Sequence, residues 1–133
     1  MSITLYFSKQ GIIRIKDYER INTASKTDVL LAVKNYLKAG PMVGTFEVYG
    51  SDFDNYGKVV ESESKFIDEI YFVKKRARKP WTHVVVVTGF GFQGIYPFWE
   101  FQNSYGPSWR GAARGFGQIY AIHLRWLYGF TLA

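Results

Sequence analysis

The sequence predicts an α+β domain, in which a single helix packs on an antiparallel sheet or a partly closed β-barrel. Aromatic residues make up 19% of the chain, and such residues favour strands. Only one segment has clear helical periodicity, whereas several short apolar segments are separated by turn residues. The 133 residues contain no internal repeat and no linker, so we expect one domain spanning residues 1–133.

The predicted helix covers residues 27–39. Ser25 followed by Asp28 resembles a capping box, and Thr27 is the other candidate N-cap. Gly40, which a proline follows, is a typical stop signal. One apolar face at helical spacing is expected to contact the core: Val29, Leu30, Val33 and Leu37.

The remaining apolar segments predict strands. Four consecutive valines at 84–87 predict a strand buried on both faces. Residues 52–57 and 89–94 are rich in Gly, Asp and Asn, which predicts turns. Strands are expected at 3–7, 12–18 (with Ile13 and Ile15 on one face), 42–49, 81–88, 96–102 and 115–122, while 66–73 is ambiguous, with a short strand at 70–73.

Composition excludes several classes of function. The chain contains no cysteine, which rules out disulfides, thiolate metal sites and a thiol nucleophile within it. Its two histidines lack metalloprotease spacing, so we expect neither a metal nor another cofactor. No apolar run approaches the ~20 residues that span a bilayer. The net charge of +6 is concentrated in a run at 74–79, expected to be a solvated loop; without a recognisable nucleic-acid module, we do not expect nucleic acid as a partner.

The predicted hairpin brings two polar residues together. If its turn centres near residue 93, the residue opposite His83 is 102 or 103. Opposed residues have Cβ atoms ~5 Å apart, so Asn103 is expected beside His83. A side-chain amide that accepts from one ring nitrogen fixes the histidine tautomer.

Two segments resemble the motifs that carry the catalytic histidine and asparagine of the papain family of cysteine proteases. Residues 82–91 (THVVVVTGFG) resemble the family's His-Ala-Val-x-x-x-Gly-Tyr-Gly segment, and residues 102–109 (QNSYGPSW) resemble Lys-Asn-Ser-Trp-Gly-x-x-Trp. Further matches are residues 40–48 (GPMVGTFEV), 53–60 (FDNYGKVV), 98–101 (FWEF) and 115–116 (GF). The resemblance covers about residues 14–130 and implies the β-rich, right-hand half of papain.

The resemblance implies a role for each site residue. His83 and Asn103 are the family-equivalent catalytic residues, and Trp81, Tyr105 and Trp109 are shielding or binding aromatics. The family's Cys-bearing helical half has no counterpart, so His83 and Asn103 are expected to be inactive in this chain alone. Tyr105 replaces the shielding Trp, Arg110 replaces a Gly, and the loop from Trp109 to Gly115 is two residues longer; these differences are typical of relaxed constraint.

Three functions are consistent with these residues. The first is a non-catalytic binding or regulatory domain, in which a second copy or another protein covers the bare inter-domain face, with a peptide or small molecule as a further ligand. The second is the His/Asn chain of a two-chain cysteine peptidase, and the third is an enzyme that uses His83 as a general base. The location is expected to be cytoplasmic if Met1 is the true start, and vacuolar, lysosomal or secreted if the chain derives from a longer precursor.

Overall fold

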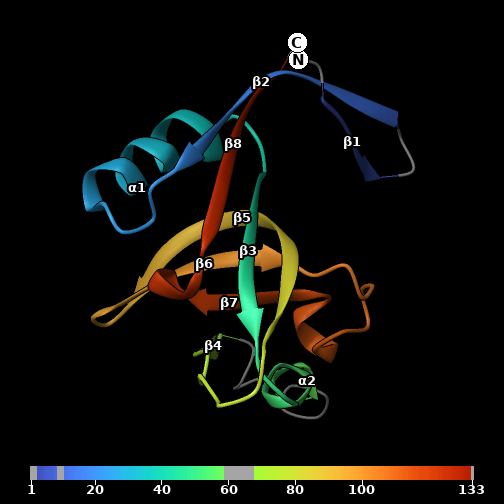
Figure 1. The fold of residues 1–133 in the computed structure, drawn as a ribbon. Coiled ribbons are helices and arrows are strands. Elements are labelled where there is room, and N and C mark those ends of the chain that lie inside the picture. The colour runs from blue at the N-terminus through green and yellow to red at the C-terminus, as the bar shows by residue number, and fades with distance from the viewer. Residues whose placement is uncertain (1–2, 9–10, 59–67, 133) are drawn as a thin grey trace.

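The computed structural model describes residues 3–8, 11–58 and 68–132, which fold around one eight-stranded sheet (Figure 1). The strands lie in the order β1-β2-β8-β3-β5-β6-β7-β4. Neighbouring strands are antiparallel except β4 and β7, which are parallel. The strands are β1 (Ile3–Ser8), β2 (Gly11–Ile21), β3 (Met42–Val48), β4 (Ile70–Tyr71), β5 (Trp81–Gln93), β6 (Tyr96–Gln102), β7 (Phe116–Tyr120) and β8 (Trp126–Leu132).

The helices are α1 (Lys26–Ala32), continued by a π-type turn η1 (Val33–Leu37), and α2 (Asp52–Lys58). Two short 3₁₀ turns, η3 (Gly111–Ala113) and η4 (Ala121–His123), flank β7. The predicted α+β class with an antiparallel sheet is confirmed. The sheet is open rather than a closed barrel, because β1 and β4 form its two edges.

The first helix and its continuation η1 pack against β8 at Gly129, which has no side chain. Ser25 is its N-cap, accepting a hydrogen bond from the Asp28 N–H at 3.2 Å, as one of the two predicted caps. A Cβ at Gly129 would lie 2.4 Å from the ring of Tyr36, so this glycine admits the η1 side chain. The prediction that Leu30 belongs to the core-facing side is wrong: it is 53% exposed, while Ala32 is 1% exposed.

The segment predicted as a turn at 52–57 is the helix α2. Phe53 and Tyr56, three residues apart, are both buried and give this short helix an apolar face. A Cβ at Gly57 would lie 2.3 Å from Nε1 of Trp109, so the glycine serves close packing rather than a turn. Because Asp, Asn and Gly favour turns, the sequence predicted a turn here rather than an amphipathic helix.

The valine strand is buried on one face only. Val85 and Val87 are 3% and 0% exposed, whereas Val84 is 54% exposed, so the prediction of burial on both faces is wrong. Antiparallel pairing with β3 and β6 leaves the other face without a covering layer formed by the described residues. The strand also continues to Gln93, which pairs with Tyr96. The turn therefore lies at residues 94–95, not 89–94, and Gly94 adopts a positive φ of 58° there.

In three places the observed strands differ from the predicted ones. β8 was not predicted from the sequence, yet it pairs with β2 and β3 and joins the N-terminal hairpin to the rest of the sheet. The last predicted strand ends at Tyr120, where η4 begins. The strand at Ile70–Tyr71 is shorter than predicted. The side chains of Ile13 and Ile15, and all of residues 59–67, lie outside the described part.

Part of the core is a cluster of aromatic rings, and aliphatic side chains make up the rest. The cluster surrounds Phe46, which contacts Phe53, Tyr71 and Phe101 with ring centroids 5.3–6.1 Å apart. The basic run at 74–79 is exposed, and Nη2 of Arg76 donates to both carboxylate oxygens of Asp52 at 2.9 Å. None of the helices in the described part of the chain is long and apolar enough to span a bilayer.

Candidate active site

His83 and Asn103 form a buried hydrogen-bonded pair. Nε2 of His83 lies 2.7 Å from Oδ1 of Asn103, and the two residues are 6% and 5% exposed. Their proximity was predicted, but the predicted register is wrong. Val86 pairs with Gln102, and continuing that register would place Tyr105 opposite His83.

Asn103 reaches His83 because it is the first residue after β6. The chain leaves the sheet at this point, and the Asn103 N–H donates to the carbonyl of Gly115 at 2.9 Å. This bond ties the asparagine to the start of β7. The amide side chain then spans the remaining gap to His83 without a strand-to-strand pairing.

The hydrogen bonds define the tautomer of His83. Oδ1 of Asn103 also accepts from the backbone N–H of Ser104 at 2.8 Å, and a backbone N–H can only donate. Oδ1 is therefore an acceptor toward His83 as well, so Nε2 carries a proton. In the neutral ring, Nδ1 keeps its lone pair, and no group among the described residues is hydrogen-bonded to it.

Burial lowers the pKa of His83 below its usual 6.5, and the hydrogen bond to Asn103 partly offsets this by raising the pKa. Burial penalises the charged imidazolium, while the amide oxygen favours the protonated ring. The ring is therefore neutral at pH 7, with Nδ1 able to accept a proton.

Four aromatic rings surround the His83 ring. The centroids of Phe53, Tyr105, Phe46 and Trp81 lie 5.1, 5.3, 5.4 and 5.4 Å away. Trp81 and Tyr105 form the outer wall, since they are 46% and 47% exposed. Trp109 does not belong to this first ring of contacts; it packs behind, 5.3 Å from Phe53 and 6.3 Å from Tyr105.

A hollow of about 250 Å³ adjoins the pair on the other side of β5. Gln102, Asn103 and Ser104 line part of it, and four valines line the rest. Nδ2 of Asn103 is buried without a hydrogen-bond partner among the described residues. The two hydrogen bonds that Oδ1 accepts hold this amide in place, although its buried unpaired donor costs about 1–3 kcal/mol. The lining residues are Val43, Val84, Val85, Val86, Gln102, Asn103 and Ser104.

Arg110 has a structural role that the sequence did not reveal. It is 0% exposed, its guanidinium lies 4.1 Å above the ring of Tyr56, and Nη1 donates to the Phe116 carbonyl at 3.0 Å. Its φ of 58° is in the left-handed region, in keeping with the glycine that the papain motif has at this position. The signal that could have indicated this role is the glycine of the papain motif at position 110, because that glycine indicates a positive φ.

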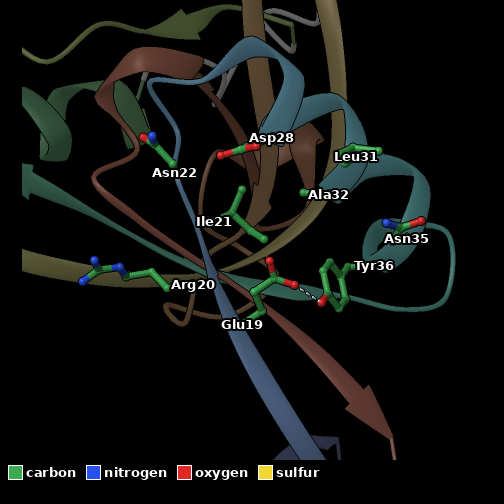
Figure 2. Close-up of a pocket in the computed structure, with 9 residues that line it drawn as sticks. All are labelled: Glu19, Arg20, Ile21, Asn22, Asp28, Leu31, Ala32, Asn35 and Tyr36. Carbon is green, nitrogen blue, oxygen red and sulfur yellow. Dashed lines mark hydrogen bonds between the residues drawn. The ribbon is translucent and has the colours of Figure 1, made fainter.

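A smaller hollow of about 150 Å³ lies between β2 and α1 (Figure 2). Glu19 closes one end by accepting a hydrogen bond from the hydroxyl of Tyr36, which raises the pKa of that tyrosine. The hollow shares no lining residue with the His83 site. Within the described residues, no three His, Cys, Asp or Glu side chains are grouped so that they could hold a metal ion.

The profile of a family described as papain family cysteine protease matches residues 5–122 of the chain. The chain belongs to the papain family of cysteine proteases. A search of curated protein sequences found no match.

Solved papain-family structures share the fold. Digestive procathepsin L2 from Tenebrio molitor is 18% identical with a TM-score of 0.56, and the match covers 90% of this chain and 35% of that one. Procathepsin B S9 from Trypanosoma congolense is 16% identical with a TM-score of 0.52, covering 91% and 37%. A structure from the study of the mite allergens Blo t 1 and Der p 1 is 22% identical with a TM-score of 0.52, covering 89% and 35%. The chain therefore spans about a third of these structures.

Proposed function

We propose that this chain is a non-catalytic papain-family domain that binds another polypeptide. The observation that carries the proposal is a buried His83–Asn103 pair in a sequence of 133 residues without any cysteine. In papain-like catalysis a thiolate attacks the carbonyl, so a histidine without a thiol forms no acyl-enzyme. The pair then acts as a structural element that joins β5 to the loop after β6.

The binding surface is an apolar strip on β8, β3 and β5, which we call the outer face. Directly paired residues project to the same side of a sheet, and the pairings of β3 align its outward residues with those of β5 and β8. Val84 and Trp126 are 54% and 38% exposed on this strip. Thr45 lies on the same side, paired with Val84 and Trp126, and the guanidinium of Arg20 lies 4.5 Å from the centroid of the Trp126 ring. The apolar residues of the outer face are Val43, Val84, Val86, Trp126 and Tyr128.

Two features support the outer face as a contact surface. The helix α1 with η1 covers the opposite side, because Tyr36 packs on Gly129, whose neighbour Tyr128 points outward. The valine-lined hollow beside Asn103 opens on this strip. An exposed apolar strip with its own hollow is typical of a protein contact surface, and a second copy is the occupant that the chain itself supplies.

A peptide-hydrolysis assay tests the non-catalytic part. We expect the purified chain to cleave no unstructured peptide, with the same background in His83→Ala. Turnover that disappears in His83→Ala while the circular dichroism spectrum stays unchanged would instead support an enzyme in which His83 is a general base.

The unpaired Nδ1 of His83 favours one alternative, the His/Asn chain of a two-chain peptidase. In that case a cysteine on a partner chain would face Nδ1. Hydrolysis would appear only after mixing with a Cys-bearing papain-family half, and an epoxysuccinyl inhibitor of cysteine proteases would abolish it. If the mixture stays inactive while the two chains bind each other, the non-catalytic proposal stands.

A further inference from the structure

The largest hollow described in this structure, about 390 Å³, lies apart from the His83 site and has a basic lining. Its volume falls in the ~300–1,000 Å³ range of small-molecule sites. None of its lining residues belongs to the outer face or to the aromatic rings around His83. The lining residues are Thr23, Glu47, Tyr49, Val73, Lys75, Ile122, His123, Leu124 and Arg125.

Three basic side chains meet at this hollow, and only one has an acidic partner there. Arg125 bonds to Glu47 through Nη1 and Oε1. The other oxygen of Glu47 accepts from the hydroxyl of Tyr49 at 2.8 Å, so each carboxylate oxygen already has a partner.

Lys75 and His123 line the same hollow, and neither has an acidic ion-pair partner among the described residues. The pKa of His123 is lowered, first by burial and then by the charge of Lys75. Two cationic groups so close together disfavour each other, and a bound anion would relieve this repulsion. The exposed run at 74–79 adds positive potential beside the opening.

We propose that this hollow is a binding site for a phosphate monoester. At pH 7 the lowered pKa of His123 leaves its ring neutral, so the charged side chains that line the hollow, Lys75 and Arg125 against Glu47, sum to +1. A phosphate monoester carries about −1.5 to −2 at pH 7 and would favour protonation of His123, which raises the sum to +2. Val73 and Ile122 supply apolar walls for the organic part of the ligand.

Histidine-detected NMR tests the site with an internal control, because the chain has only two histidines. Titration with inorganic phosphate should shift the ring signals of His123 in a saturable way and leave those of His83 unmoved. Phosphoserine in a short peptide and glycerol phosphate should do the same, and the tighter of the two shows whether a protein segment or a small metabolite is the source. Signals of both histidines moving in parallel without saturation, or no shift at all, overturn the proposal.

A pair of lysine variants separates a defined site from general attraction to a basic loop. Lys75→Ala should weaken phosphate binding about tenfold, the loss of one charge-assisted contact. Lys74→Ala removes the same charge from the neighbouring residue, which does not line the hollow, and should change binding little. Equal weakening by both variants overturns a built site.

The pH dependence gives an independent readout with sulfate, which keeps its double charge while histidine titrates. Binding should strengthen as pH falls and His123 becomes protonated, and the bound anion should raise the pKa of His123. The other titratable groups around the ring are Glu47, Tyr49, Lys75, Tyr120 and Arg125. In His123→Gln the dependence should disappear; if it persists, His123 is not a ligand and the proposed charge match fails.

Discussion

His83 and Asn103 form the buried hydrogen-bonded pair at the centre of the candidate site. The asparagine oxygen holds the Nε2–H of the histidine and the backbone of Ser104 at 2.7 and 2.8 Å. Aromatic rings exclude water from the pair on the core side. The motif residues predicted the contact, whereas the strand arithmetic gave the wrong register, because two glycines that suggested a turn lie inside β5.

Variants of Asn103 should move the pKa of His83 in opposite directions. Asn103→Ala removes the hydrogen bond that raises this pKa, so the pKa should fall further below 6.5. Asn103→Asp places a carboxylate beside the ring and should raise it. An NMR pH titration measures both, with the exposed neighbour variant Gln102→Ala as control. A shift of the same sign in both Asn103 variants would contradict the assigned role of Asn103.

The same histidine should make stability depend on acid pH. Its pKa is lowered in the folded chain, so the unfolded chain binds more protons as pH falls through the ordinary value of 6.5. The stabilisation is present above that value and is lost as pH falls through the folded pKa. Urea unfolding between pH 7.5 and about 5 should show a falling free energy of unfolding, and a smaller fall in His83→Gln. An identical fall in the variant would exclude His83 as a source.

Tyr71 should make the free energy of unfolding fall at alkaline pH. Burial is the largest cause that raises its pKa from 10 to about 12. The folded chain holds this proton where the unfolded chain has released it, so stability is present below pH 10 and is lost as pH rises toward 12. Two pKa units correspond to roughly 2–3 kcal/mol. Tyr71→Phe should remove this part of the alkaline loss in urea unfolding, whereas an unchanged alkaline limb would show that Tyr71 is not its source.

At the scale of elements, periodic segments were predictable and close-packed ones were not. The strand from Tyr96 to Gln102 and the cap at Ser25 follow local rules that the sequence displays. The helix α2 does not, because its residues favour turns and its stability comes from Trp109 packing on Gly57, fifty-two positions away in the chain. β8 has no turn signal that would have separated it from the preceding apolar residues.

Replacing Gly57 by alanine tests this packing. The new Cβ would lie 2.3 Å from Nε1 of Trp109, a rigid ring that core neighbours hold in place. Overpacking of this kind costs typically ~1–3 kcal/mol. Gly40→Ala, where nothing lies within 4 Å of the new Cβ, should leave stability unchanged or slightly higher. Thermal unfolding compares the two, and equal effects would mean that α2 does not dock on Trp109 as described.

At the scale of the whole molecule, the chain is a β-rich part of a papain-family fold. It spans 35–37% of the solved structures it matches. Family motifs were sufficient to predict the fold class, whereas the pairing of β8 with β2 and β3 joins segments far apart in the chain and was not predicted. What covers the outer face does not follow from one sequence, since surface contact depends on a second molecule. The proposed function therefore depends on association through Val84 and its neighbours.

Sedimentation equilibrium at micromolar concentration tests this association most directly. The wild-type chain should have a mass above that of the 15.4 kDa monomer. Val84→Lys, which places a charge in the middle of the outer face, should be a monomer. Ile95→Lys is the matched control, because Ile95 is 84% exposed at the β5–β6 turn, away from that face, and this variant should associate like the wild type. A wild-type chain that remains monomeric at every concentration, or a Val84→Lys variant that associates unchanged, would contradict the account.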